Sequence, residues 1–190
     1  MKFEKYNIYT RGETPFVING TVDFSDMNQM FVDLRMKASD YELMNAPKNR
    51  KATVFGKIYV DVDGTLNGPL DALKMRGSMN VLGKTDFTYV LKDSPLMVTD
   101  RLGEMVEFVN FNDTVTVEQE AVQKVPLTGM DIAMTIHIDE AVQVHVDLTP
   151  DASNYMEVEG GGDLAFQYTP QGEMRLNGRY SLIRGEMKYE

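Results

Sequence analysis

The sequence predicts an all-β fold built around a strongly coiled sheet, and three observations support this prediction. Apolar and polar residues alternate at every second position along most of the chain, which is the spacing of strands. Turn-forming glycines and prolines interrupt this alternation at short intervals, and no stretch keeps helical spacing beyond one or two turns. Glycines also fall inside the expected strands, where they favour bends or close backbone contact: Gly20, Gly56, Gly77, Gly160 and Gly178.

The N-terminal part of the chain is expected to contribute strands at residues 2–9, 16–24 and 30–36. Residues 41–50 are predominantly polar and contain a proline, so we expect a connection rather than a strand there. The alternation then resumes at residue 54. Over residues 54–66 the pattern predicts a pair of strands.

The middle of the chain continues in the same way. Ile58, Val60 and Val62 are expected on one face of their strand, and lysine, tyrosine and aspartate on the other. Further strands are expected at residues 73–81 and 87–91 and, after a turn, in a short apolar run at 105–111. Residues 112–128 have a mixed pattern that predicts no clear element.

Residues 130–148 carry the clearest alternation. The apolar positions are spaced two apart in two runs: Ile132, Met134, Ile136 and Ile138, then Val142, Val144, Val146 and Leu148. The break at residues 139–141 predicts a short turn, so the two runs are expected to pair as a hairpin. Strands at residues 154–168 and 174–182 follow; they include Leu164, Phe166 and Leu176.

Composition limits the functions that are open to the chain. Its 190 residues are enough for one domain, expected to span 1–190 as a fragment of a much larger chain because both ends look like interrupted strands. The absence of cysteine excludes disulfides, thiolate metal sites and cysteine nucleophiles. A net charge of −10 argues against nucleic acid and anionic membrane surfaces as partners. No run is long enough for a transmembrane helix, and no signal peptide opens the chain.

Two groups of residues have types found in metal sites. His137 and His145 lie on the polar side of residues 130–148, and with Asp139 or Asp147 they could bind a divalent metal if the hairpin placed them opposite each other. The Asp-Val-Asp-Gly run at residues 61–64 resembles part of a calcium loop, but it lacks the remaining ligands and the closing glutamate. Solvated strand residues and a strand turn are the favoured interpretations, so neither a metal nor another cofactor is expected.

The methionines are the remaining unusual feature. Several lie on the alternating apolar faces: Met30, Met36, Met75, Met79, Met134, Met156 and Met174. Core filling is the favoured interpretation on residue type alone, and a deformable surface for a flexible apolar ligand is the alternative.

The order and spacing of several segments resemble the C-terminal region of the TamB family, with its Bacteroidetes members the closest. The segments are VFGKIYVDVDGTLNGPL at residues 54–70, LKMRGSMNV at 73–81, TYVLKDSP at 88–95, YMEVEGGGDL at 155–164 and GEMRLNGRYSLIRGEMKY at 172–189. Each segment alone is weak, since it consists of glycines and alternation. Together they cover nearly the whole chain, although in the family more strands follow the last segment.

This resemblance implies an elongated sheet curled into a half-open trough (taco-like or β-helix-like) with an apolar interior. It implies a periplasmic protein that is anchored in the inner membrane when complete and helps carry phospholipid between the two membranes. A role in outer-membrane protein assembly, with a β-barrel of the BamA or TamA type as partner, is implied for some lineages. No catalytic residue is carried over, so the chain is not expected to be an enzyme.

Three hypotheses follow. In the first, acyl chains bind an apolar groove formed by Ile58, Val60, Val62, Met75, Met79, Ile132, Met134, Ile136, Val142, Val144, Val146, Leu164, Phe166 and Leu176. In the second, the chain is a scaffold that binds client β-strands at a sheet edge. In the third, it is a hydrolase or a carbohydrate-binding β domain. A closed β-sandwich, whose two sheets cover each other, would remove the groove.

Overall fold

The computed structural model describes residues 1–25, 30–49, 52–91, 129–149 and 151–189. Every strand in these residues belongs to one ten-stranded mixed sheet, and no helix occurs among them. The all-β prediction is therefore confirmed, and the two-sheet sandwich is wrong for the described part of the chain. The described residues also contain no helix suited to crossing a membrane. The predictions for residues 105–111 and 112–128 lie outside the described residues.

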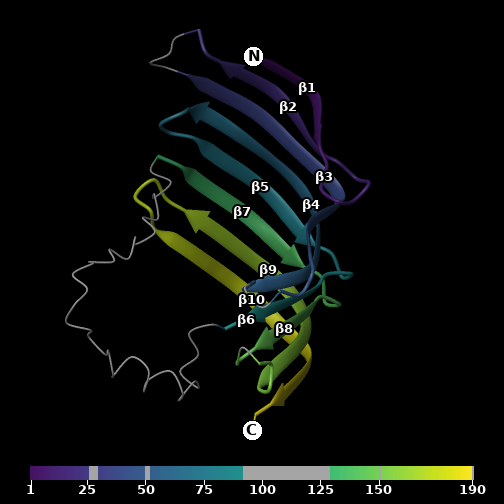
Figure 1. Ribbon diagram of the computed structural model, residues 1–190. Helices are drawn as coiled ribbons and strands as arrows, with labels where there is room; N and C mark the ends of the chain where they lie inside the picture. Colours follow the sequence, from purple (N-terminus) through teal and green to yellow (C-terminus); the bar gives the residue numbers. More distant parts are fainter. Residues whose placement is uncertain (26–29, 50–51, 92–128, 150, 190) are drawn as a thin grey trace, which may run out of the picture.

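The ten strands have the following bounds: β1 Lys2–Ile8, β2 Phe16–Asp23, β3 Phe31–Ala46, β4 Val54–Pro69, β5 Lys74–Val81, β6 Asp86–Val90, β7 Asp131–Ile138, β8 Gln143–Asp147, β9 Tyr155–Tyr168 and β10 Met174–Lys188. Strands β1 to β5 follow one another as antiparallel neighbours, and β6 pairs with the first residues of β4. Strands β7 and β8 join this part in parallel, β7 beside β5 and β8 beside β6, and β9 and β10 complete the sheet (Figure 1).

Strand β3 is longer than the sequence predicts. The expected polar connection at residues 41–50 is wrong, because β3 continues to Ala46 and stays paired with β4. Two register shifts, between Ala38 and Tyr41 and between Glu42 and Met44, let it continue. Such bulges insert an extra residue and break the simple alternation, which is why the pattern looks like a loop. The strand pair expected at residues 54–66 is likewise one strand, the 16-residue β4.

The hairpin expected within residues 130–148 is also wrong. Strands β7 and β8 do not pair with each other but lie one after the other along β9, with Ile136 beside Leu164 and Val144 beside Val158. The residues between them form a tight turn, in which Val142 N–H donates to the Asp139 carbonyl at 3.1 Å. The chain leaves this turn in the direction in which it entered. Strands β5 and β6 are related in the same way, and both pair with β4.

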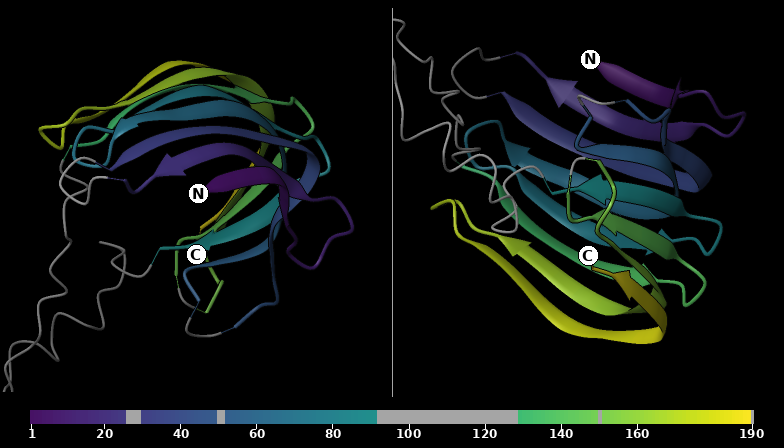
Figure 2. Two further views of the ribbon diagram at one scale, coloured as in Figure 1. Left: turned by 90° about the horizontal axis from the view of Figure 1, so that it is seen from above. Right: turned by 60° about the horizontal axis from the view of Figure 1, so that its bottom comes forward.

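The turn between β5 and β6 lies beside the turn between β7 and β8, and together they form a crease across the sheet. Asp139 N–H donates to the Val81 carbonyl at 3.0 Å, and Gln143 N–H donates to the Thr85 carbonyl at 3.0 Å. We call the line through residues 38–42, 82–85 and 139–142 the crease. Seen from above, the sheet bends over, and its short strands β6 and β8 lie beneath the longer ones (Figure 2).

Of the five buried apolar side chains among the described residues, all but Val32 lie at or beside this crease. Ala38, Tyr41 and Val60 form the core cluster, and Val142 is 2% exposed. Glycine allows the backbones to approach there, since a Cβ on Gly160 would lie 2.2 Å from the Ser181 carbonyl oxygen. Close approach at glycines and a bent sheet therefore go together in this fold.

Candidate functional site

One row of apolar residues crosses the middle of the sheet. Val62 of β4 pairs with Met79 of β5, Met79 with Ile136 of β7, and Ile136 with Leu164 of β9. Residues that pair directly place their side chains on the same face. Four of the residues predicted to form the groove therefore line up across four strands, although the hairpin predicted for residues 130–148 does not form.

Two further rows run beside it on the same face. One comprises Ile18, Met36, Gly64, Gly77, Met134, Phe166 and Leu176. The other comprises Gly20, Leu34, Leu66, Met75, Ile132, Tyr168 and Met174. Both rows lie on the same face as the first row. Each is displaced from it by two or four residues along a strand, and residues an even number apart on a strand share a face.

The same face continues beyond the crease. Val144 pairs with Val158 of β9, and Val146 pairs with Met156. Val158 and Leu164 are six residues apart on one strand, so their side chains lie on one face. Ile58 and Val60 alternate with Val62 in the same way, and Val142 precedes β8 in the same alternation. All fourteen residues predicted for the groove thus lie on one face of the sheet, which we call the apolar face.

Exposure along the apolar face changes from the crease to the edge. Val60 is 1% exposed at the crease, whereas Met75 and Ile136 are half-buried. Leu176 on the edge strand β10 is 57% exposed. No described strand outside this sheet packs on the apolar face. Within the described residues, then, the apolar face is closed at the crease and open toward β10.

The sequence reasoning missed apolar residues at both borders of this face. Phe16 and Tyr41 pack edge to face at 5.6 Å between ring centroids, and Phe16 pairs with Ala38. Leu182 and Met187 extend the exposed border along β10. The alternation in residues 16–22 would have found Phe16, and that in residues 174–182 would have found Leu182. The register shifts after Ala38 and after Leu182 hide Tyr41 and Met187.

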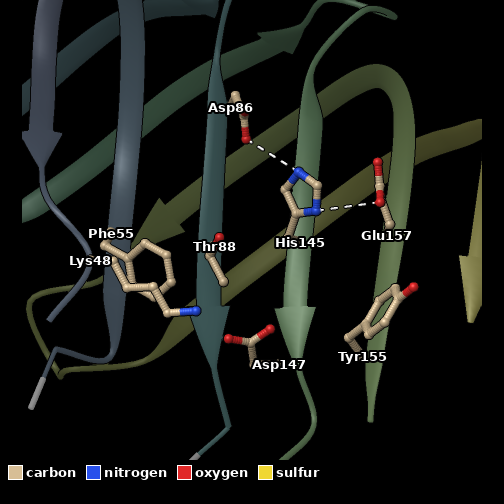
Figure 3. A pocket seen from close by; sticks show the side chains of 8 residues that line it. All are labelled: Lys48, Phe55, Asp86, Thr88, His145, Asp147, Tyr155 and Glu157. Carbon is tan, nitrogen blue, oxygen red and sulfur yellow. Dashed lines mark ion pairs between the residues drawn. The ribbon is translucent and has the colours of Figure 1, made fainter. Parts of the chain in front are cut away.

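The opposite face carries both histidines, and the structure separates them. His137 Nδ1 lies 2.8 Å from Asp163 Oδ1, between β7 and β9. His145 lies between two carboxylates, 3.3 Å from Asp86 and 3.6 Å from Glu157, on β8 between β6 and β9 (Figure 3). The register needed for a shared metal site does not form, since β7 and β8 are not paired.

The acidic run at residues 61–64 also lies inside the sheet. Asp61 accepts a hydrogen bond from the Asp40 N–H at 2.7 Å, and Asp63 lies 3.7 Å from Arg35. Both aspartates belong to β4 rather than to a loop. Among the described residues, no group of three or more histidines and carboxylates is placed to hold a metal ion.

Charged groups on this face link neighbouring strands. Arg76 of β5 contacts Asp131 of β7 at 2.6 Å, and this hydrogen bond lowers the pKa of Asp131. At the crease, Tyr59 O–H donates to Glu42 at 3.1 Å, and the Lys84 ammonium lies 4.1 Å from the Tyr59 ring centroid. Burial, and then the hydrogen bond to Glu42, raise the pKa of Tyr59. The polar face thus contributes to strand pairing.

Comparison with known families agrees with this architecture. The family model of the TamB C-terminal domain matches residues 5–189. No curated protein matches the chain, and no solved structure does. The TamB family belongs to the Gram-negative envelope, where it is a non-enzymatic component of the systems that handle lipid or assemble outer-membrane proteins. The match covers nearly the whole chain, so the chain belongs to the TamB family, as its C-terminal domain.

Proposed function

We propose that this domain is a segment of a periplasmic β-trough whose apolar face binds the acyl chains of phospholipid and helps carry phospholipid between the inner and outer membranes. In the full-length protein the trough is anchored in the inner membrane. An outer-membrane β-barrel of the BamA or TamA type is the proposed partner at the far end.

The observation that supports this proposal is the continuity of the apolar face. The row from Val62 through Met79 and Ile136 to Leu164 crosses four strands without a polar residue. The two rows beside it are equally free of charge. A charged group at any of these positions would interrupt the path of an acyl chain, because its desolvation is costly.

The energetics suit binding that still permits movement. Each methylene buried against such a face contributes about 0.8 kcal/mol. These contacts have no preferred direction, so an acyl chain can shift along the face without losing a specific bond. The methionines Met75, Met79 and Met134 add a flexible, polarizable surface that can follow a moving chain.

Photo-crosslinking from the apolar face tests the proposal. A photoreactive amino acid at Ile136, and separately at Val144, is expected to capture phospholipid in cells, detected by mass spectrometry of the purified adduct. Thr135 is the matched control, because it neighbours Ile136 on the same strand but is exposed on the opposite face. Capture at residues 136 and 144 but not at 135 supports the proposal. Equal capture at all three, or none at any, contradicts it.

A second candidate function is a scaffold for outer-membrane protein assembly, and strand β10 favours it. All fifteen residues of β10 are exposed, and among the described strands β10 pairs only with β9. Its free edge could accept a client strand through main-chain hydrogen bonds. Crosslinks from β10 to client strands, together with an absence of lipid at residues 136 and 144, would favour this function over lipid binding.

A further inference from the structure

A separate cavity of about 430 Å³ lies on the polar side of the sheet, beyond the crease. Its lining comes from four strands and from the residues that follow β3 (Figure 3): Lys48, Phe55, Asp86, Thr88, His145, Asp147, Tyr155 and Glu157. Strand alternation places His145 and Asp147 on the face of β8 opposite Val144 and Val146. The cavity is therefore distinct from the apolar face, and its volume is in the range of small-molecule sites, roughly 300–1,000 Å³.

The charges around the cavity are unequal. Three carboxylates, those of Asp86, Asp147 and Glu157, face one ammonium group, that of Lys48. His145 bridges two of the carboxylates and leaves the third, Asp147, without its contact. The described side chains of the lining thus leave an excess of negative charge, which favours a cationic ligand over an anionic one.

Asp147 is the most informative of the three carboxylates. It is 8% exposed, and its side chain points into the cavity (Figure 3). Its backbone carbonyl accepts a hydrogen bond from Leu91 N–H, but within the described residues its carboxylate has neither a hydrogen bond nor an ion pair. An ionised carboxylate accepts hydrogen bonds at both of its oxygens. A ligand with N–H groups would supply the missing donors.

Two aromatic rings in the lining indicate what the uncharged part of the ligand contacts. The Lys48 ammonium lies 5.5 Å from the centroid of the Phe55 ring, so one wall of the cavity already holds an ammonium group against an aromatic face. Tyr155 lies beside Asp147 on the neighbouring strand, where its ring can cover an alkyl chain (Figure 3). Lys48 occupies the position that an external ammonium would prefer.

From these contacts we infer that the cavity binds an organic cation with a primary ammonium group on an alkyl chain. The ammonium donates to Asp147 and Glu157, and the alkyl chain lies against Tyr155. A free diamine and a lysine side chain of a peptide both carry this chemistry. Lys48 competes with the ligand for the carboxylates and for the Phe55 ring.

Titration of the purified domain with 1,4-diaminobutane, followed by NMR of backbone amides, tests this inference. Saturable shifts are expected at Thr88, Asp147 and Tyr155, and 1,4-butanediol, which has the same length but no charge, is expected to cause none. A blocked lysine peptide and its norleucine counterpart identify the source: tighter binding of the lysine peptide points to a protein partner, and tighter binding of the diamine to a free amine.

Three substitutions with opposite expected effects make the test decisive. Asp147→Asn is expected to weaken diamine binding about tenfold, and Lys48→Met to tighten it, because the competing ammonium is removed. Glu157→Gln, at an exposed side chain, repeats the first change if Asp147→Asn fails to fold. Asp163→Asn is the control, as a carboxylate on the polar face outside the cavity.

Several results would overturn the inference: no saturable binding, equal binding of the diol, or unchanged affinity in both carboxylate variants. Weaker diamine binding in Lys48→Met would do the same, because it would mean that Lys48 supports the site rather than competing with the ligand.

Discussion

Thr85 shows how a single side chain completes the crease. Between Val60 and Lys57, strand β4 has no described strand as partner on one side, because β5 ends at Val81 and β6 begins at Asp86. Thr85 is 1% exposed, and its hydroxyl accepts a hydrogen bond from Tyr59 N–H at 3.0 Å. It also contacts the Tyr59 carbonyl oxygen at 3.3 Å. The side chain therefore replaces a missing strand residue.

Thr85→Val keeps the shape of this side chain and removes its hydroxyl. The Tyr59 N–H then loses its acceptor in a buried position, so the free energy of unfolding is expected to fall by about 1–3 kcal/mol. Urea unfolding measures this change, with the exposed Thr135→Val as control, expected to stay within about 0.5 kcal/mol of the unaltered protein. A Thr85→Val variant as stable as the control would show that water replaces the hydroxyl.

Asp151 makes the stability of the turn before β9 depend on pH in the acid range. The Thr149 side chain, followed by the Ser153 backbone and side chain, hydrogen-bonds the Asp151 carboxylate and lowers its pKa from 3.8 to about 2. A lowered pKa means that the folded turn favours the ionised form. Its stabilisation is therefore complete above pH 3.8 and is lost as the pH falls toward 2.

Thr149→Val removes the largest of these contributions. The pKa of Asp151 is expected to move back toward 3.8, measured by NMR titration of its carboxyl carbon. Asp23 is the internal control, because its pKa is lowered by hydrogen bonds from Ser25, far from this turn. An unchanged Asp151 titration in the variant would assign the lowered pKa to Ser153 alone.

At the scale of elements, the strands were predictable and several of their pairings were not. Alternation is a local property, so β5, β7 and β9 could be placed from residue types alone. The partner of a strand depends on residues far along the chain, and the parallel pairing of Met79 with Ile136 joins positions 57 apart. The hairpin prediction failed for this reason: the turn at residues 139–141 is tight, yet it does not reverse the chain.

Strand β10 is the element most open to further pairing. Of the strands that the structure describes it contacts only β9, so every second backbone N–H along it points away from this sheet. These outward amides are expected to exchange hydrogen rapidly, whereas those of β4 and β9, which are paired on both sides, exchange slowly. Residue-resolved hydrogen exchange checks this expectation. Uniform protection along β10 would mean that another strand already covers its edge.

At the scale of the whole molecule, the fourteen apolar residues predicted from alternation lie on one face because the sheet is continuous through the crease. The cavity on the other face could not be predicted in this way. Its lining comes from β4, β6, β8, β9 and Lys48, which follows β3, and the parallel pairing of β6 with β8 brings these residues together. Residue types were enough to predict which face of the sheet each side chain lies on. Which polar residues come together in the cavity depends on the strand topology.

The paired breaks at residues 82–85 and 139–142 have one more consequence. Regularly alternating strands can slide past each other by two residues and still present the same side chains to each face. Here such slippage would move the turn at residues 139–142 away from the turn at residues 82–85. It would break the hydrogen bonds from Asp139 to Val81 and from Gln143 to Thr85. The bend therefore fixes a single register between β5–β6 and β7–β8.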